Sequence, residues 1–266
     1  MNYLIIFSLI CVFSTSNANP TRISGGSVAD IKEYPFAVSL LSSSGTINFS
    51  QLCGGTIITR SAILSAASCF VSNYVYLTPN RVDSELWWRA RVGSSYFDRQ
   101  GQVYLIRRIT IHPGFKSATR AHDIAVLRTT GNIAFGLSVQ AANIAGESYL
   151  VATNQPVMAV GWGVTSVLSP YSPRLRQVEI WVNDQQTCAN RYRGVFGVTT
   201  NMICAGLLDT GVRGQCQGDT GSPLLHNGVV VGVYSWTPGC GTDYYPNINT
   251  RVSAYSRWIV STTSIA

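Results

Sequence analysis

The stretch Gly218-Asp219-Thr220-Gly221-Ser222-Pro223 says most about how this chain folds, and it has a companion in Ala66-Ala67-Ser68-Cys69 far upstream. Both belong to a series of short motifs that runs along the chain in a fixed order. We know of only one fold that carries such a series. Its other members are Cys53-Gly54-Gly55, Asp123-Ile124-Ala125, Gly161-Trp162-Gly163, Cys204-Ala205-Gly206 and Ser235-Trp236.

The series resembles the motifs of the trypsin/chymotrypsin-like serine proteases, and the resemblance covers essentially all of residues 23–266. In that family the two leading motifs are Gly-Asp-Ser-Gly-Gly-Pro and Ala-Ala-His-Cys. The resemblance implies an all-β fold of two six-stranded antiparallel barrels, at about residues 23–128 and 129–251. It also implies a short C-terminal helix at 252–264 and a site in the cleft between the barrels.

Apolar patterning agrees with a β-rich chain, because short runs rich in Val, Ile and Tyr alternate with turn residues. The apolar residues of the last segment recur at helical spacing, which predicts the C-terminal helix. The strands predicted most clearly lie at residues 36–40, 55–58, 63–65, 124–127, 156–160, 176–182 and 229–236.

Two of the three catalytic groups that the family uses are replaced. Thr220 stands at the serine position and Ser68 at the histidine position, whereas Asp123 retains the aspartate. A hydroxyl accepts a proton poorly, Ser68 is too short to reach from Asp123 to Thr220, and the β-branch of Thr220 crowds an acyl intermediate. Loss of the base alone costs such a triad on the order of a millionfold in turnover. The sequence therefore predicts an inactive serine protease homologue that is not an enzyme.

Three histidines remain as replacement bases, and we expect none to serve. His112 lies in a surface turn motif, and His226 follows Thr220 on what should be the next strand. His122 is next to Asp123, so in a strand it would point to the opposite face. All three are predicted to be surface or packing residues.

The resemblance also assigns an oxyanion hole and a specificity pocket. The amides of Gly218 and Thr220 would form the oxyanion hole. Gly214 stands where trypsins carry the aspartate that binds Lys or Arg. Thr237 and Asn247 replace glycines of the pocket walls, which predicts a shallow pocket like that of elastase. Neutral drift after a loss of activity would explain the same wall residues.

An activation site is implied by Arg22-Ile23. Cleavage after Arg22 would leave Ile23 as a new N-terminus, and its ammonium would pair with Asp219, as happens when a zymogen of this family is activated. Ser222 replaces a glycine in the same loop as Asp219, so we expect strain there if that position needs a positive φ.

The N-terminus has the pattern of a secretory signal peptide, residues 1–18, followed by a short activation peptide at 19–22. Its apolar core, residues 3–13, is too short to cross a bilayer and is followed by small polar residues up to Ala18. A buried strand is the alternative. Because no second long apolar stretch follows, we expect a secreted, extracellular chain that does not associate with membranes.

Seven cysteines are present, and Cys11 lies in the signal segment. The six that remain suggest three disulfides, for which the sequence alone allows fifteen pairings. No C-x-x-C pair or Cys/His cluster occurs, so we expect no metal and no cofactor. Asn48 begins an N-glycosylation sequon, a short pattern that also arises by chance. The family resemblance implies the pairs Cys53–Cys69, Cys188–Cys204 and Cys216–Cys240.

The cationic residues are almost all arginine: of 19 Lys and Arg, only Lys32 and Lys116 are lysines. Arginine stays protonated above pH 12, so this bias keeps the surface charged in alkaline fluid. It resembles the bias of trypsin-like proteins from the caterpillar midgut and suggests an insect gut lumen, with codon bias as the alternative. The net charge is +7, but no basic run exceeds Arg107-Arg108, so nucleic acid is not an expected partner.

These observations favour a secreted monomer that acts by binding a protein. The partner would be a protease inhibitor, for which the chain serves as a decoy, or an active protease whose action it regulates. A serine-type endopeptidase with residual or atypical activity is the alternative, and a storage or structural role is a third. Fold alone does not choose among them.

Overall fold

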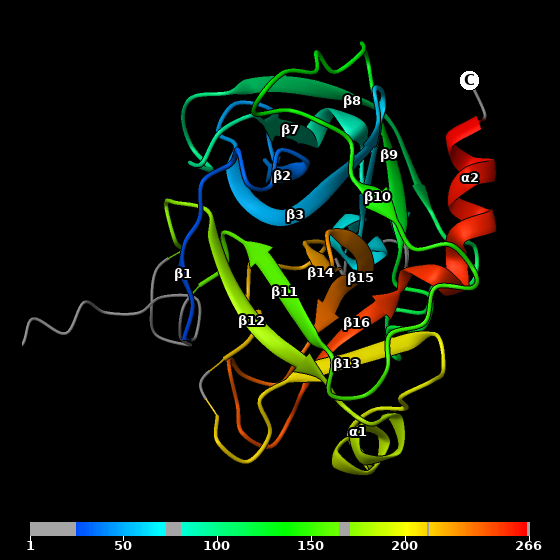
Figure 1. The fold of residues 1–266 in the computed structure, drawn as a ribbon. Helices are drawn as coiled ribbons and strands as arrows, with labels where there is room; N and C mark the ends of the chain where they lie inside the picture. Colours follow the sequence, from blue (N-terminus) through cyan, green and yellow to red (C-terminus); the bar gives the residue numbers. More distant parts are fainter. Residues whose placement is uncertain (1–24, 73–80, 165–170, 212, 265–266) are drawn as a thin grey trace, which may run out of the picture.

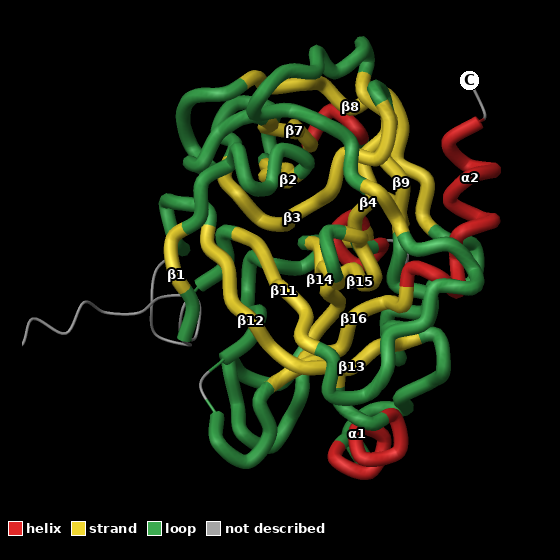
Figure 2. The backbone as a smooth tube through the Cα atoms, in the orientation of Figure 1, coloured by secondary structure: helices red, strands yellow, loops and turns green. Residues whose placement is uncertain are grey.

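The computed structural model describes residues 25–72, 81–164, 171–211 and 213–264 (Figure 1). The signal segment, Arg22 and Ile23 lie outside the described residues. Two lobes built of strands lie one above the other, with helices α1 (Gln185–Arg191) and α2 (Ser256–Ser264) at their margins (Figure 2).

The first lobe is a closed barrel of six antiparallel strands in the order β2-β3-β4-β9-β8-β7. Each strand pairs with its neighbour through a regular antiparallel ladder with a few bulges. Its strands are β2 (Ala37–Ser42), β3 (Ser50–Thr59), β4 (Ala62–Ser65), β7 (Trp88–Val92), β8 (Gln102–Ile111) and β9 (Ala125–Thr129).

The second lobe closes in the same way. Its strands run in the order β12-β11-β14-β15-β16-β13, and β13 pairs back onto β12. The fold class expected from the sequence is therefore confirmed. The strands are β11 (Pro156–Gly161), β12 (Arg176–Val182), β13 (Met202–Gly206), β14 (Pro223–His226), β15 (Val229–Trp236) and β16 (Asn247–Arg251).

Shorter elements attach to the barrels. Strand β1 belongs to the N-terminal part of the chain but pairs with β12 of the second barrel, and β10 adds to β15 in parallel. Strands β5 and β6 form a separate pair. The bounds are β1 (Ser27–Val28), β5 (Val71–Ser72), β6 (Arg81–Val82), β10 (Asn143–Ile144), η1 (Ala67–Phe70), η2 (Glu85–Trp87), α1 (Gln185–Arg191), η3 (Val252–Tyr255) and α2 (Ser256–Ser264).

Local sequence explains several of these elements. In β12 the side chains alternate, so that Val178 and Ile180 are buried while Glu179 between them is exposed. Helix α1 begins after Asp184, whose carboxylate accepts from the Thr187 N–H at 2.7 Å and caps the first turn. The predicted C-terminal helix is a 3₁₀ turn, η3, that continues into α2.

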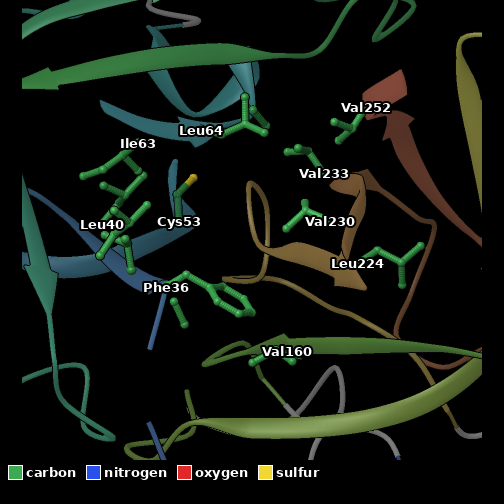
Figure 3. Packing of buried hydrophobic residues seen from close by; sticks show 14 of the residues in the cluster. Phe36, Leu40, Cys53, Ile63, Leu64, Val160, Leu224, Val230, Val233 and Val252 are labelled. Carbon is green, nitrogen blue, oxygen red and sulfur yellow. The ribbon is translucent and has the colours of Figure 1, made fainter. Parts of the chain in front are cut away.

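One hydrophobic core joins the two barrels. Figure 3 shows Leu40 and Ile63 on the side of the first barrel and Val230 and Val233 on the side of the second. Phe36 belongs to the same buried cluster. Because the barrels share a core, their relative position is set by close packing, and so is the geometry of the cleft between them.

Three disulfides link elements within the two barrels. Cys53–Cys69 joins β3 to η1, Cys188–Cys204 joins α1 to β13, and Cys216–Cys240 joins the loop before β14 to the loop after β15. These are the pairs that the family resemblance implies. Disulfides of this number are typical of extracellular chains. Within the described ranges, no helix is long and apolar enough to cross a bilayer.

Candidate active site

Asp123 lies where the two barrels meet, just before β9, and its side chain is fully buried. The Ser68 N–H and hydroxyl donate to its carboxylate at 2.7 and 2.8 Å. The Ser235 hydroxyl donates from β15 at 2.6 Å. Burial raises the pKa of Asp123, while the hydroxyl groups of Ser235 and Ser68 act in the opposite direction. Asp123 is therefore an oriented carboxylate that is more basic than usual.

Ser68 is held in η1 by its neighbours. Ala66 and Ala67 are completely buried, and the Cys53–Cys69 disulfide ties the turn to β3. This fixes the Ser68 hydroxyl on Asp123. Among the described residues, no hydrogen bond joins Ser68 to Thr220, as the short side chain predicts.

Thr220 occupies the loop that leads into β14 and is half-buried. Its carbonyl accepts from the Gly54 N–H at 2.8 Å. The next residue, Gly221, has a φ of 87° and donates its N–H to the Tyr234 carbonyl at 2.8 Å. The loop is thus pinned from both barrels, and Thr220 lines the pocket between them.

The family resemblance assigns an oxyanion hole to the amides of Gly218 and Thr220, which lie on either side of Asp219. Within the described parts of the chain, the N–H groups of Gly218 and Thr220 have no acceptor. The Gln51 side-chain amide donates to the Gly218 carbonyl at 2.7 Å, which holds that peptide with its carbonyl turned toward Gln51. Gly218 has a φ of 90°, and the ring of Tyr171 lies where a Cβ would stand. Two backbone donors therefore remain available beside Thr220.

The expectation of strain at Ser222 is wrong. Ser222 is not among the described non-glycine residues with positive φ, and its N–H donates to the Asp219 carbonyl at 2.7 Å in an ordinary turn. The left-handed position is that of Gly221. The Ser222 hydroxyl instead fills the space beside Gly54, where a Cβ would meet it. Ser222 is accommodated because its neighbour on β3 is a glycine.

Asp219 is a second fully buried carboxylate. It accepts from the N–H groups of Gly163 at 2.7 Å and Cys216 at 3.0 Å. Gly161 and Gly163 leave no room for a Cβ against this carboxylate, which explains why the Gly-Trp-Gly motif has glycines. Burial raises the pKa of Asp219 to about 6, because two backbone donors only partly replace water.

The raised pKa of Asp219 predicts a pH-dependent stability. The folded-state pKa lies above the unfolded value of about 3.9, so the folded chain binds the proton more tightly. Its contribution is complete below about pH 4 and is lost as the pH rises through 6. Urea unfolding of the uncleaved protein and of Asp219→Asn at pH 4, 5, 6 and 7 measures this. From pH 4 to pH 7, we expect the free energy of unfolding of the wild type to fall by about 2–3 kcal/mol relative to that of the variant. Parallel curves would contradict the assignment.

The pocket beside Thr220 has a volume of about 110 Å³. Asn247 is buried and does not line the pocket; its side-chain amide accepts from the Gln215 N–H at 2.9 Å and donates to the Gln215 carbonyl at 3.0 Å. A Cβ on Gly214 would collide with Asn247, so a larger residue at position 214 requires a change at Asn247. Thr237 is buried in the wall and lies 3.4 Å from the Tyr192 hydroxyl.

Tyr234 and Arg120 are among the pocket residues that the sequence analysis did not single out. Tyr234, on β15, is buried and lines the pocket. Arg120 lines the same pocket and lies 3.7 Å from the Asp123 carboxylate. The only sequence signal for Arg120 is its position three residues before Asp123.

The histidines lie away from Thr220. The sequence placed His122 in a strand, but it lies in a turn with a φ of 56°. Its ring contacts the Tyr255 hydroxyl at 3.0 Å. It stacks on His112 with ring centroids 4.9 Å apart. His226 ends β14 and contacts Tyr149. None of the three lines the pocket.

Two closed barrels hold a buried aspartate, a hydroxyl at the nucleophile position and two free backbone N–H groups in one cleft. This combination defines the scaffold of a double-barrel serine protease.

A family model described as Trypsin matches residues 23–259, and the chain belongs to the trypsin family of serine proteases. It is 46% identical over 243 residues to Trypsin, alkaline B of Manduca sexta, covering 91% of each chain. It is 44% identical over 239 residues to Trypsin CFT-1 of Choristoneura fumiferana, covering 90% of each. It is 30% identical over 259 residues to Vitellin-degrading protease of Bombyx mori, covering 96% of this chain and 92% of that relative. The family and the insect origin expected from the sequence are confirmed.

The prediction that the chain is not an enzyme is wrong. The relatives that match nine tenths of it are named trypsins, which points to a serine endopeptidase. The prediction gave the replaced side chains at Ser68 and Thr220 more weight than the backbone donors of Gly218 and Thr220. Such donors supply transition-state stabilisation that does not depend on a histidine.

Proposed function

We propose that the chain is a secreted serine-type endopeptidase that works at low turnover through an altered site. The observation that carries this proposal is the pair of free N–H groups of Gly218 and Thr220 beside the Thr220 hydroxyl. The similarity to trypsins over nearly the whole chain supports it. Three disulfides fit a secreted chain.

In this proposal the Thr220 hydroxyl attacks the substrate carbonyl, and the two N–H groups bind the negative charge that develops on its oxygen. Each such donor is worth about 100- to 1,000-fold in rate. The proton leaves Thr220 to solvent, because no imidazole stands beside it. Collapse of the intermediate breaks the peptide C–N bond, the leaving amine takes a proton from solvent, and water then hydrolyses the Thr220 ester. Asp123 and Ser68 keep the cleft polar but do not reach Thr220. Catalysis without the base retains about 1,000- to 10,000-fold over the uncatalysed reaction.

Proton transfer to solvent predicts an unusual pH profile. An enzyme with a catalytic histidine gains activity through a pKa near 6.5 and then levels off. Here the rate should keep rising with hydroxide concentration into the alkaline range. This profile suits an alkaline gut lumen, for which the excess of arginine over lysine is further support.

The pocket sets the substrate class that we propose. The described residues that line it include no carboxylate, so a Lys or Arg side chain finds no partner there. The chain should therefore differ from trypsins in cleaving poorly after basic residues. A protease inhibitor remains the protein partner that we propose for the cleft, one without a basic residue at its reactive site.

The proposal is tested by Thr220→Ala, with hydrolysis of an activated p-nitrophenyl ester and of a fluorogenic peptide as readouts. The recombinant chain is first cleaved after Arg22. We expect the variant to lose at least about 10-fold of the wild-type rate, because the acyl-enzyme can no longer form. Thr130→Ala, at an exposed position, is the matched control. Equal rates for wild type and Thr220→Ala, or no wild-type rate above background, would contradict the proposal.

A further inference from the structure

Arg120 lies three residues before Asp123 and brings a permanent positive charge into the cleft. Its guanidinium lies 3.7 Å from the Asp123 carboxylate and 31% of its side chain is exposed. It lines the pocket together with Thr220 and Trp236.

The N–H groups of Arg120 are not used by Asp123. A separation of 3.7 Å is too long for a hydrogen bond. The Asp123 carboxylate is already satisfied by three shorter donors, two from Ser68 and one from Ser235. Within the described residues, the Arg120 side chain has no hydrogen-bond acceptor of its own. A guanidinium carries five donors, and these remain available to a ligand.

The lining of the pocket leaves that charge without a competitor. Arg120 is its only charged side chain among the described residues, and the rest are polar or aromatic groups. Gly214 contributes no carboxylate at the floor. Asp219 is buried behind the pocket and turned toward the N–H groups of Gly163 and Cys216. A bound anion would therefore meet a guanidinium and several hydroxyl and amide groups. The carboxylate beside that guanidinium, Asp123, is not among the residues that line the pocket.

We infer that Arg120 makes this pocket a site for a peptide carboxylate, and that the substrates are peptides with an acidic side chain at the cleavage position or with a free C-terminal carboxylate. The inference rests on the proposed function, of which it names the substrate class. Arginine suits a carboxylate because its planar fork donates two parallel hydrogen bonds. The half-buried setting strengthens such a bond compared with one in water.

A purely structural role for Arg120, as counter-ion of Asp123, is the competing explanation. It predicts that Arg120→Gln changes stability but not the choice among ligands. The binding-site role predicts that Arg120→Gln changes the choice between charged and neutral ligands. The two explanations therefore separate in a comparison of charged and neutral ligands.

The test is isothermal titration calorimetry on the protein cleaved after Arg22, carried out in the Thr220→Ala background so that no peptide is turned over. Four blocked tripeptides are compared: Ac-Ala-Ala-Glu-NH₂ with its Gln counterpart, and Ac-Ala-Ala-Ala with a free C-terminus against its amide. We expect at least one carboxylate peptide to bind about 10-fold or more tightly than its neutral partner. The Glu pair reports a side-chain carboxylate, and the Ala pair reports a C-terminal one.

Variants at Arg120 decide the cause. Arg120→Gln should abolish the preference, and Arg120→Lys should keep part of it with the charge in place. Arg257→Gln removes the same charge at an exposed position on α2 and should leave the preference unchanged. The inference would be overturned if the protein with Arg120 unchanged bound charged and neutral peptides equally. It would also be overturned if the preference for the carboxylate peptide survived Arg120→Gln. Because no turnover is measured, failure of the proposed function would not affect this result.

Discussion

The double variant Ser68→His with Thr220→Ser should hydrolyse an activated ester at least about 1,000-fold faster than the wild-type chain. Loss of the base costs such a triad on the order of a millionfold, and a graft into an intact scaffold should recover part of it. The position is prepared, because the Ser68 N–H and hydroxyl already point at Asp123. An imidazole there would donate to the same carboxylate, which fixes the tautomer that a base requires.

Arg120 is the main obstacle to this recovery, since its guanidinium lies beside the same carboxylate. Adding Arg120→Ala should increase the rate further. Adding Asp123→Asn to the double variant should lower the rate by about 10,000-fold through the wrong tautomer. Initial rates from pH 5 to 10 should show a plateau above the histidine pKa, absent in the wild type. A double variant as slow as the wild type at every pH would refute the view that the scaffold is intact.

Gly221→Ala is expected to destabilise the protein by about 3–5 kcal/mol. Gly221 has a φ of 87°, a region that costs an alanine about 1–3 kcal/mol. A Cβ there would also collide with the Ser65 hydroxyl and the Gly54 carbonyl, and overpacking adds a similar cost. Both neighbours belong to the first barrel, so the loop would have to withdraw from it.

Urea unfolding followed by near-ultraviolet circular dichroism, with the disulfides intact, measures this loss. Gly131→Ala is the matched control, because nothing lies within 4 Å of its Cβ position and its φ is not positive. The control should change the free energy of unfolding by less than about 0.5 kcal/mol. Similar midpoints for the two variants would show that the Thr220 loop is not pinned as described.

Much of the fold could be predicted from the sequence because its motifs carry backbone requirements. The glycines of Gly161-Trp162-Gly163 mark close approach to Asp219, and those flanking Thr220 mark backbone with positive φ. Strand β16 was not among the predicted strands, because it contains Asn247, Asn249 and Thr250. These residues lack the apolar pattern of a strand but are buried in the second barrel, where Asn247 and Thr250 form side-chain hydrogen bonds.

The sequence predicted the positions of the main site residues, but it predicted only part of the chemistry of the pocket around them. The places of Asp123, Ser68 and Thr220 followed from the motifs. Arg120 and Tyr234 did not, because each enters the pocket through tertiary packing that no local pattern encodes. The expected strain at Ser222 failed for the same reason, since φ at one loop position depends on how the whole loop is anchored.

The central claim, that Thr220 is a working nucleophile beside an intact oxyanion hole, is tested most directly by a fluorophosphonate probe. The protein cleaved after Arg22 is incubated with the probe at pH 10, and the adduct is located by peptide mass spectrometry. We predict slow labelling on Thr220 in the wild type, loss of that adduct in Thr220→Ala, and faster labelling in the Ser68→His double variant. The account would be contradicted if the probe left Thr220 unlabelled. It would also be contradicted if the probe labelled another residue and that adduct persisted in Thr220→Ala.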